Sequence, residues 1–174
     1  MNMRWTRLAF LVVCMTTAHA AQPPAIPPSE AVIQACLHLQ ASHGVRYRVI
    51  ATNRQYVEED ADGTYVATSF RDHGQKLGYM QRQTGHGLIW GQREIALANA
   101  HPLDAQANAP SEFTPGLAMW AYVQEARQRY LCINFNFDGL GQSGSFQRVH
   151  GLYLMPIPAS KTQGLQLFYG VRLL

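Results

Sequence analysis

From residue 45 to the C-terminus, apolar and polar residues alternate in short segments, and this pattern constrains the fold most. The first segment reads V-R-Y-R-V over residues 45–49, and a similar alternation runs through residues 165–174. Period-two alternation is typical of a strand that buries one face. Glycine, asparagine, aspartate or proline interrupts the segments, which indicates turns between about eight short strands, mainly antiparallel.

A helix is predicted ahead of these strands, over residues 30–43. Ser29 is a helix-capping residue type, and Gly44 stands where a helix would have ended. Between them Val32, Cys36 and Leu39 recur at helical spacing. The expected fold class is therefore α+β, with one N-terminal helix packed on a mainly antiparallel β-sheet that forms a sandwich or an open barrel.

Turn signals divide the strand region further. Asp62-Gly63 predicts a hairpin between strands at 56–57 and 65–66. A second hairpin is predicted from 119–123 and 130–137, although a helix through 119–130 fits the same apolar spacing. Other strands are expected at 45–53, 76–82, 87–97, 145–157 and 165–174. The polar segment 98–116 is long for a connection without a function.

The N-terminal segment has the three parts of a secretory signal peptide. A basic start and a short apolar stretch lead to Ala18-His19-Ala20, which predicts a signal peptide at 1–20 that is cleaved after Ala20. A lipoprotein modified at Cys14 is the alternative. A proline-rich leader at 21–28 and a single globular domain at 29–174 would follow. No later apolar stretch could span a bilayer, so we expect a periplasmic or secreted protein without stable membrane insertion.

The charge balance does not indicate nucleic acid as a partner. The chain has 14 basic and 11 acidic residues, and cleavage after Ala20 removes Arg4 and Arg7. The mature chain then carries 12 basic and 11 acidic residues, a net charge of +1. Nucleic-acid binding requires clustered lysine and arginine, which this balance gives no reason to expect.

Two cysteines remain after cleavage, Cys36 and Cys132, and in an oxidising compartment such a pair predicts a disulfide. A zinc site that adds His38 and His43 is the alternative, but it lacks the paired spacing of strong zinc sites, and no metal is expected. The bond would pin the helix across the sheet. The strand face that holds Cys132 should then be covered at its start and wetter towards Asn134 and Asn136.

The sequence Gly139-Leu140-Gly141-Gln142-Ser143-Gly144 matches the G-x-G-x-x-G pattern of dinucleotide sites. Such a site needs a helix after the loop and an acidic residue about twenty positions further on. Residues 145–157 have strand composition, and Asp138 is the last acidic residue of the chain. No cofactor is therefore expected, and a glycine-rich hairpin connection is the preferred interpretation.

The same loop also contains the serines for a catalytic alternative. Gly141-Gln142-Ser143-Gly144-Ser145 resembles a nucleophile elbow but has serine at its fifth position, and a triad with His150 and Asp138 rests on co-occurrence alone.

The expected function is non-catalytic recognition of another protein. We expect an exported inhibitor or immunity-type protein that blocks a toxin or a cell-wall-degrading enzyme. Its contact surface would be the 138–145 loop, through Asp138, Gln142, Ser143 and Ser145, with 98–116 as a possible addition. The alternatives are a periplasmic hydrolase that uses Ser143 or Ser145, and a β-barrel carrier of a small apolar ligand.

Overall fold

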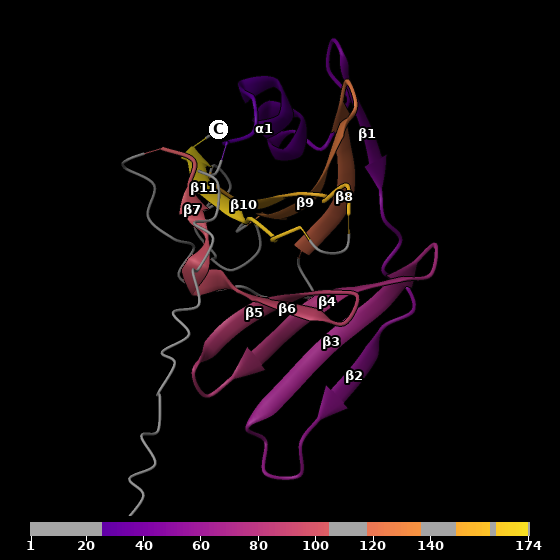
Figure 1. Cartoon of the computed structure of the whole chain (residues 1–174), viewed down its shortest axis with the longest axis vertical. Coiled ribbons are helices and arrows are strands. Elements are labelled where there is room, and N and C mark those ends of the chain that lie inside the picture. Colours follow the sequence, from indigo (N-terminus) through magenta and orange to yellow (C-terminus); the bar gives the residue numbers. More distant parts are fainter. Residues whose placement is uncertain (1–25, 105–117, 137–148, 161–162, 174) are drawn as a thin grey trace, which may run out of the picture.

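The computed structural model describes residues 26–104, 118–136, 149–160 and 163–173. These residues form three layers: the helix α1, a six-stranded sheet (sheet A) and a five-stranded sheet (sheet B), as Figure 1 shows. This is the α+β arrangement with a helix packed on antiparallel sheet that the sequence predicts. The predicted signal peptide lies outside the described residues. Within them, no helix has the length and apolar character needed to cross a membrane.

The helix α1 covers Glu30–Leu37 and begins at the predicted cap. The Ser29 hydroxyl accepts a hydrogen bond from the Val32 N–H at 3.3 Å. The predicted end at residue 43 is wrong, because the helix stops at Leu37 and Leu39 adopts a left-handed backbone with φ of 54°. Residues 42 and 45 already pair as an isolated β-bridge.

Sheet A has the strand order β1-β8-β9-β10-β11-β7, antiparallel except for the pair β11 and β7. Its strands in chain order are β1 Val45–Val49, β7 His101–Pro102, β8 Ala118–Glu125, β9 Gln128–Asn136, β10 Val149–Pro156 and β11 Phe168–Leu173. The predicted hairpin of β8 and β9 is confirmed, and the alternative helix through 119–130 does not form.

Sheet B follows chain order: β2 Tyr56–Glu59, β3 Tyr65–Asp72, β4 Gln75–Arg82, β5 Gly85–Trp90 and β6 Arg93–Ala96. The predicted Asp62-Gly63 turn joins β2 and β3, and Gly63 has a φ of 69°. The single strand predicted at 87–97 is wrong. A turn at Gly91, with a φ of 66°, divides this segment into β5 and β6, and the short 3-10 helix η1 covers Leu97–Asn99.

The two faces of sheet A bury different clusters. On β9, Leu131 and Ile133 point towards sheet B, whereas Cys132 points towards α1, as the alternation predicts. The inter-sheet cluster includes Phe70 of sheet B and Trp120 of sheet A, whose ring centroids are 5.1 Å apart in an edge-to-face arrangement. The two sheets therefore form a sandwich that shares one core.

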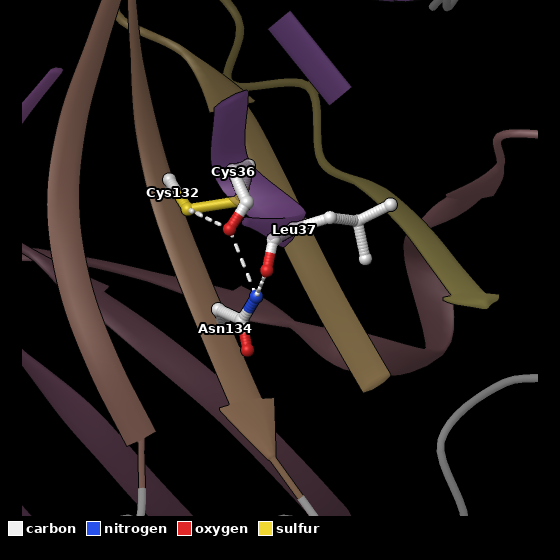
Figure 2. The surroundings of a disulfide bond; sticks show 4 residues. All are labelled: Cys36, Leu37, Cys132 and Asn134. Atoms are coloured by element: carbon white, nitrogen blue, oxygen red, sulfur yellow. Dashed lines mark hydrogen bonds between the residues drawn. A yellow bond between two sulfur atoms is a disulfide. The ribbon is translucent and has the colours of Figure 1, made fainter. Parts of the chain in front are cut away.

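The helix is held to sheet A by a disulfide and by a buried amide. Cys36 and Cys132 form the predicted disulfide. Beside it, the Asn134 amide donates hydrogen bonds to the carbonyls of Cys36 at 2.8 Å and Leu37 at 3.0 Å, as Figure 2 shows. Asn134 is fully buried, so the expectation of a wetter face at this residue is wrong. The end of the helix covers it, and the helix carbonyls replace water as partners of its Nδ2, whereas its Oδ1 is buried without a partner among the described residues.

Candidate interaction surface

The loop predicted from the sequence connects β9 to β10. Its candidate residues Asp138, Gln142, Ser143 and Ser145 lie outside the described residues, so their role stays a prediction. The flanking strands are antiparallel neighbours, which confirms the expected hairpin connection. A dinucleotide fold requires a parallel pair with a crossover helix instead. The segment 98–116 contributes η1 and β7, and its residues 105–116 are outside the described ranges.

Among the described residues, arginines gather on the face of sheet A that points towards sheet B, near the β8–β9 turn. Arg46 of β1 and Arg129 of β9 flank Gln124 of β8 in one row of the sheet. In the adjacent row, Arg48 lies beside Tyr122. We call Arg46, Arg48, Tyr122 and Arg129 the arginine–tyrosine surface.

Tyr122 is the centre of this surface. The guanidinium carbons of Arg48 and Arg129 lie 4.9 Å and 4.8 Å from its ring centroid. Tyr122 is 7% exposed, and burial is the main cause that raises the pKa of its hydroxyl, with a further contribution from Asp72. The ring therefore stays neutral and restrains two arginines by cation–π contact.

Asp72 connects this surface to sheet B. Its two carboxylate oxygens accept hydrogen bonds from Arg48, Oδ2 from Nη2 at 2.7 Å and Oδ1 from Nη1 at 3.3 Å. The hydrogen bond from Arg48 is the main cause that lowers the pKa of Asp72. The charge of Arg48 is thus balanced within the chain, and its orientation is fixed by a bidentate pair.

The remaining arginines, Arg46 and Arg129, are less tightly compensated, although Arg129 is close enough to Asp72 to help lower the pKa of that carboxyl. Arg46 and Arg129 are exposed, and within the described part of the chain neither forms an ion pair with a carboxylate. The nearby carboxylate of Glu125 is on the opposite face of β8, where it accepts a hydrogen bond from the Ser29 hydroxyl at 2.8 Å. Arg127 in the β8–β9 turn adds another exposed cation. This end of the molecule can therefore accept carboxylates from a partner.

The described residues do not support the zinc alternative. Cys36 and Cys132 are bonded to each other, and no group of three histidine, cysteine or acidic side chains among these residues could hold a metal ion. His86, which was not part of the zinc alternative, forms a hydrogen bond through Nδ1 with the Tyr79 hydroxyl.

A ligand carrier would need empty space between the sheets, but the described side chains fill this layer. Large residues such as Trp120, Leu131 and Tyr153 occupy this layer and are at most 3% exposed. An open pocket lies outside the core instead, where Trp90 and Arg93 of sheet B face Pro158.

The sequence contains both halves of the arginine–tyrosine surface, but nothing in it joins them. R-Y-R at 46–48 shows alternate arginines on a strand, and R-Q-R at 127–129 shows the same spacing. The signal was present as one strand face with alternating arginines and one arginine at the start of β9. Only the register of β1, β8 and β9 shows that Arg46, Arg48 and Arg129 share one face.

Comparison with protein-family models, curated proteins and solved structures found no significant match to this chain.

Proposed function

We propose that this chain is an exported, non-catalytic binding protein that holds an acidic surface of another protein. The observation that supports this most is the pair of arginines on the buried Tyr122 ring: Arg48 forms an ion pair with Asp72, whereas Arg129 forms none within the described residues. Arginine and tyrosine are among the residue types enriched at the energetic hot spots of protein interfaces. A restrained arginine also loses little conformational entropy when it binds.

The class of partner that we propose is a toxin or a cell-wall-degrading enzyme, which the chain would inhibit. The leader sequence supports a periplasmic or secreted location, and the Cys36–Cys132 disulfide is of a kind that persists in oxidising compartments. The filled space between the sheets favours a surface function over the carrier alternative. The hydrolase alternative depends on Ser143 and Ser145, and the described residues add no support for it.

The test is capture by the mature chain of envelope and secreted proteins from the cells that produce it. A captured partner is then purified and titrated with the wild type, with Arg129→Glu and with Arg46→Glu at two salt concentrations. Each reversal should weaken binding by about tenfold or more, because it places a carboxylate against the partner's acidic surface. Arg71→Glu is the control: it changes the net charge by the same amount but lies on the outer face of sheet B. It should leave the affinity for the partner within about twofold of the wild type.

Two outcomes would contradict the proposal. Affinity that is unchanged in both reversals would exclude this surface as the contact. A captured enzyme or toxin whose activity is unaffected by saturating wild-type protein would exclude inhibition. Covalent labelling of Ser143 or Ser145 by a serine-directed probe would favour the hydrolase alternative instead.

A further inference from the structure

Within the described ranges, two strand edges have no neighbouring strand, and they lie on the same side of the sandwich. β1 is an edge of sheet A and β2 is an edge of sheet B, and the segment 50–55 joins them at the right of Figure 1. All four residues of β2 are exposed, and Tyr56 and Val57 are 59% and 67% exposed. An exposed edge with free backbone groups is a template for pairing with another strand.

The hydrogen bonds between β2 and β3 identify which backbone groups are free. The Asp60 N–H donates to the Tyr65 carbonyl at 3.0 Å, which continues the register of the two strands. Because hydrogen-bonded pairs alternate in an antiparallel ladder, Glu58 and Tyr56 also bond to β3. The N–H and C=O groups of Val57 and Glu59 therefore point away from sheet B.

We propose that two copies of this chain form a symmetric dimer by antiparallel pairing of their β2 strands, with Val57 opposite Val57. In this register the outward N–H and C=O groups of one copy lie opposite the outward C=O and N–H groups of the other. The same register places Tyr56 opposite Glu58 of the second copy, and it brings Asp60, the residue after β2, near the bend before β2 that holds Arg54 of the second copy. Because of the symmetry, these opposite charges meet twice.

Charge excludes the neighbouring registers. If the pairing of the two β2 strands is centred on Glu58 or on Glu59, acidic side chains of the two copies lie opposite one another, which is unfavourable. Centring it on Tyr56 leaves most of each pairing outside β2, which begins at that residue. The Val57 register is the one that combines overlap of the strands with opposite charges.

The edge of β1 does not offer the same possibility. The Ile50 N–H donates to the Trp120 carbonyl at 2.8 Å, so the outward groups of β1 belong to Tyr47 and Val49. Self-pairing centred on Tyr47 would place Arg46 opposite Arg48 of the second copy. This register of β1 brings together no opposite charges, so the dimer uses β2. This inference does not depend on the proposed function, which concerns a different surface.

Sedimentation of the oxidised mature chain over a range of concentrations tests the proposal. The wild type should show a reversible monomer–dimer equilibrium, since a single strand pair is a small interface. Arg54→Asp and Asp60→Arg should each weaken the dimer by about tenfold or more, because each places like charges in contact. The double variant Arg54→Asp/Asp60→Arg should restore it. Both positions are exposed, so folding should be retained, and circular dichroism checks this.

Arg46→Asp on β1 is the matched control and should leave the dimer unchanged. A wild type that stays monomeric at every concentration would overturn the proposal, as would a double variant that fails to restore association. Species larger than dimers that Arg46→Asp abolishes would show head-to-tail pairing of β1 with β2 instead, which also overturns it.

Discussion

At the scale of single residues, Asn134 shows how one polar side chain can end a helix. The carbonyls of Cys36 and Leu37 are among the helix-end groups that have no partner within the helix. Both accept hydrogen bonds from the Asn134 amide, which is fully buried on β9. The strand thus provides the helix with a cap. Because this cap comes from a residue almost a hundred positions away, no local pattern shows it.

We expect Asn134→Ala to lower the free energy of unfolding by about 2 kcal/mol or more, because it leaves two buried carbonyls without a donor. Urea denaturation followed by circular dichroism measures the change. Asn53→Ala makes the same truncation at an exposed site and should change the free energy by less than about 0.5 kcal/mol. Equal effects of the two substitutions would show that the Asn134 amide is not a cap.

At the scale of elements, α1 depends on sheet A for its place. It is a helix of 8 residues, and isolated helices of that length are not stable in water. Its buried residues pack on sheet A, and the disulfide fixes it to β9. The helix is therefore a consequence of tertiary packing more than of its own propensity.

Removal of the disulfide should destabilise the mature chain by about 4 kcal/mol, because the bond closes a sequence separation of 96 residues. Urea denaturation with and without a reductant measures this difference. In the double variant Cys36→Ala/Cys132→Ala, the reductant should have no further effect. A wild type equally stable in both conditions would show that packing alone holds α1 on the sheet.

At the scale of the whole molecule, the core between and beside the sheets contains several tyrosines. Burial raises the pKa of Tyr47, Tyr122 and Tyr130, and raises that of Tyr153 to about 12 from an ordinary value of 10.0. Above the ordinary value, the unfolded chain loses protons that the folded chain keeps. Stability is therefore fully present below about pH 10 and falls as the pH rises towards 12.

We expect the free energy of unfolding to decrease between about pH 10 and pH 12, with unfolding detected by near-ultraviolet circular dichroism. Tyr153→Phe should make this decrease smaller, because it removes the ionisation with the largest shift. The tyrosine assignment would be wrong if Tyr153→Phe had the same pH profile as the wild type.

The sequence alone determined the local features of this protein. Period-two alternation marked β1, β9 and β11, Asp62-Gly63 marked the β2–β3 hairpin, and Ser29 marked the start of α1. These signals depend on contacts between neighbours in the chain or on the two faces of one strand. The sequence also indicated the disulfide, because just two cysteines remain after the predicted cleavage.

Only the tertiary structure decided where α1 ends, how the strands divide into two sheets, and which arginines meet at Tyr122. Each of these depends on contacts between distant parts of the chain, and strand register decides which arginines meet. The energy that fixes the register comes from burial over whole faces, so no short segment contains it. For the same reason, the sequence did not predict the arginine–tyrosine surface, which depends on the pairing of β1 with β8.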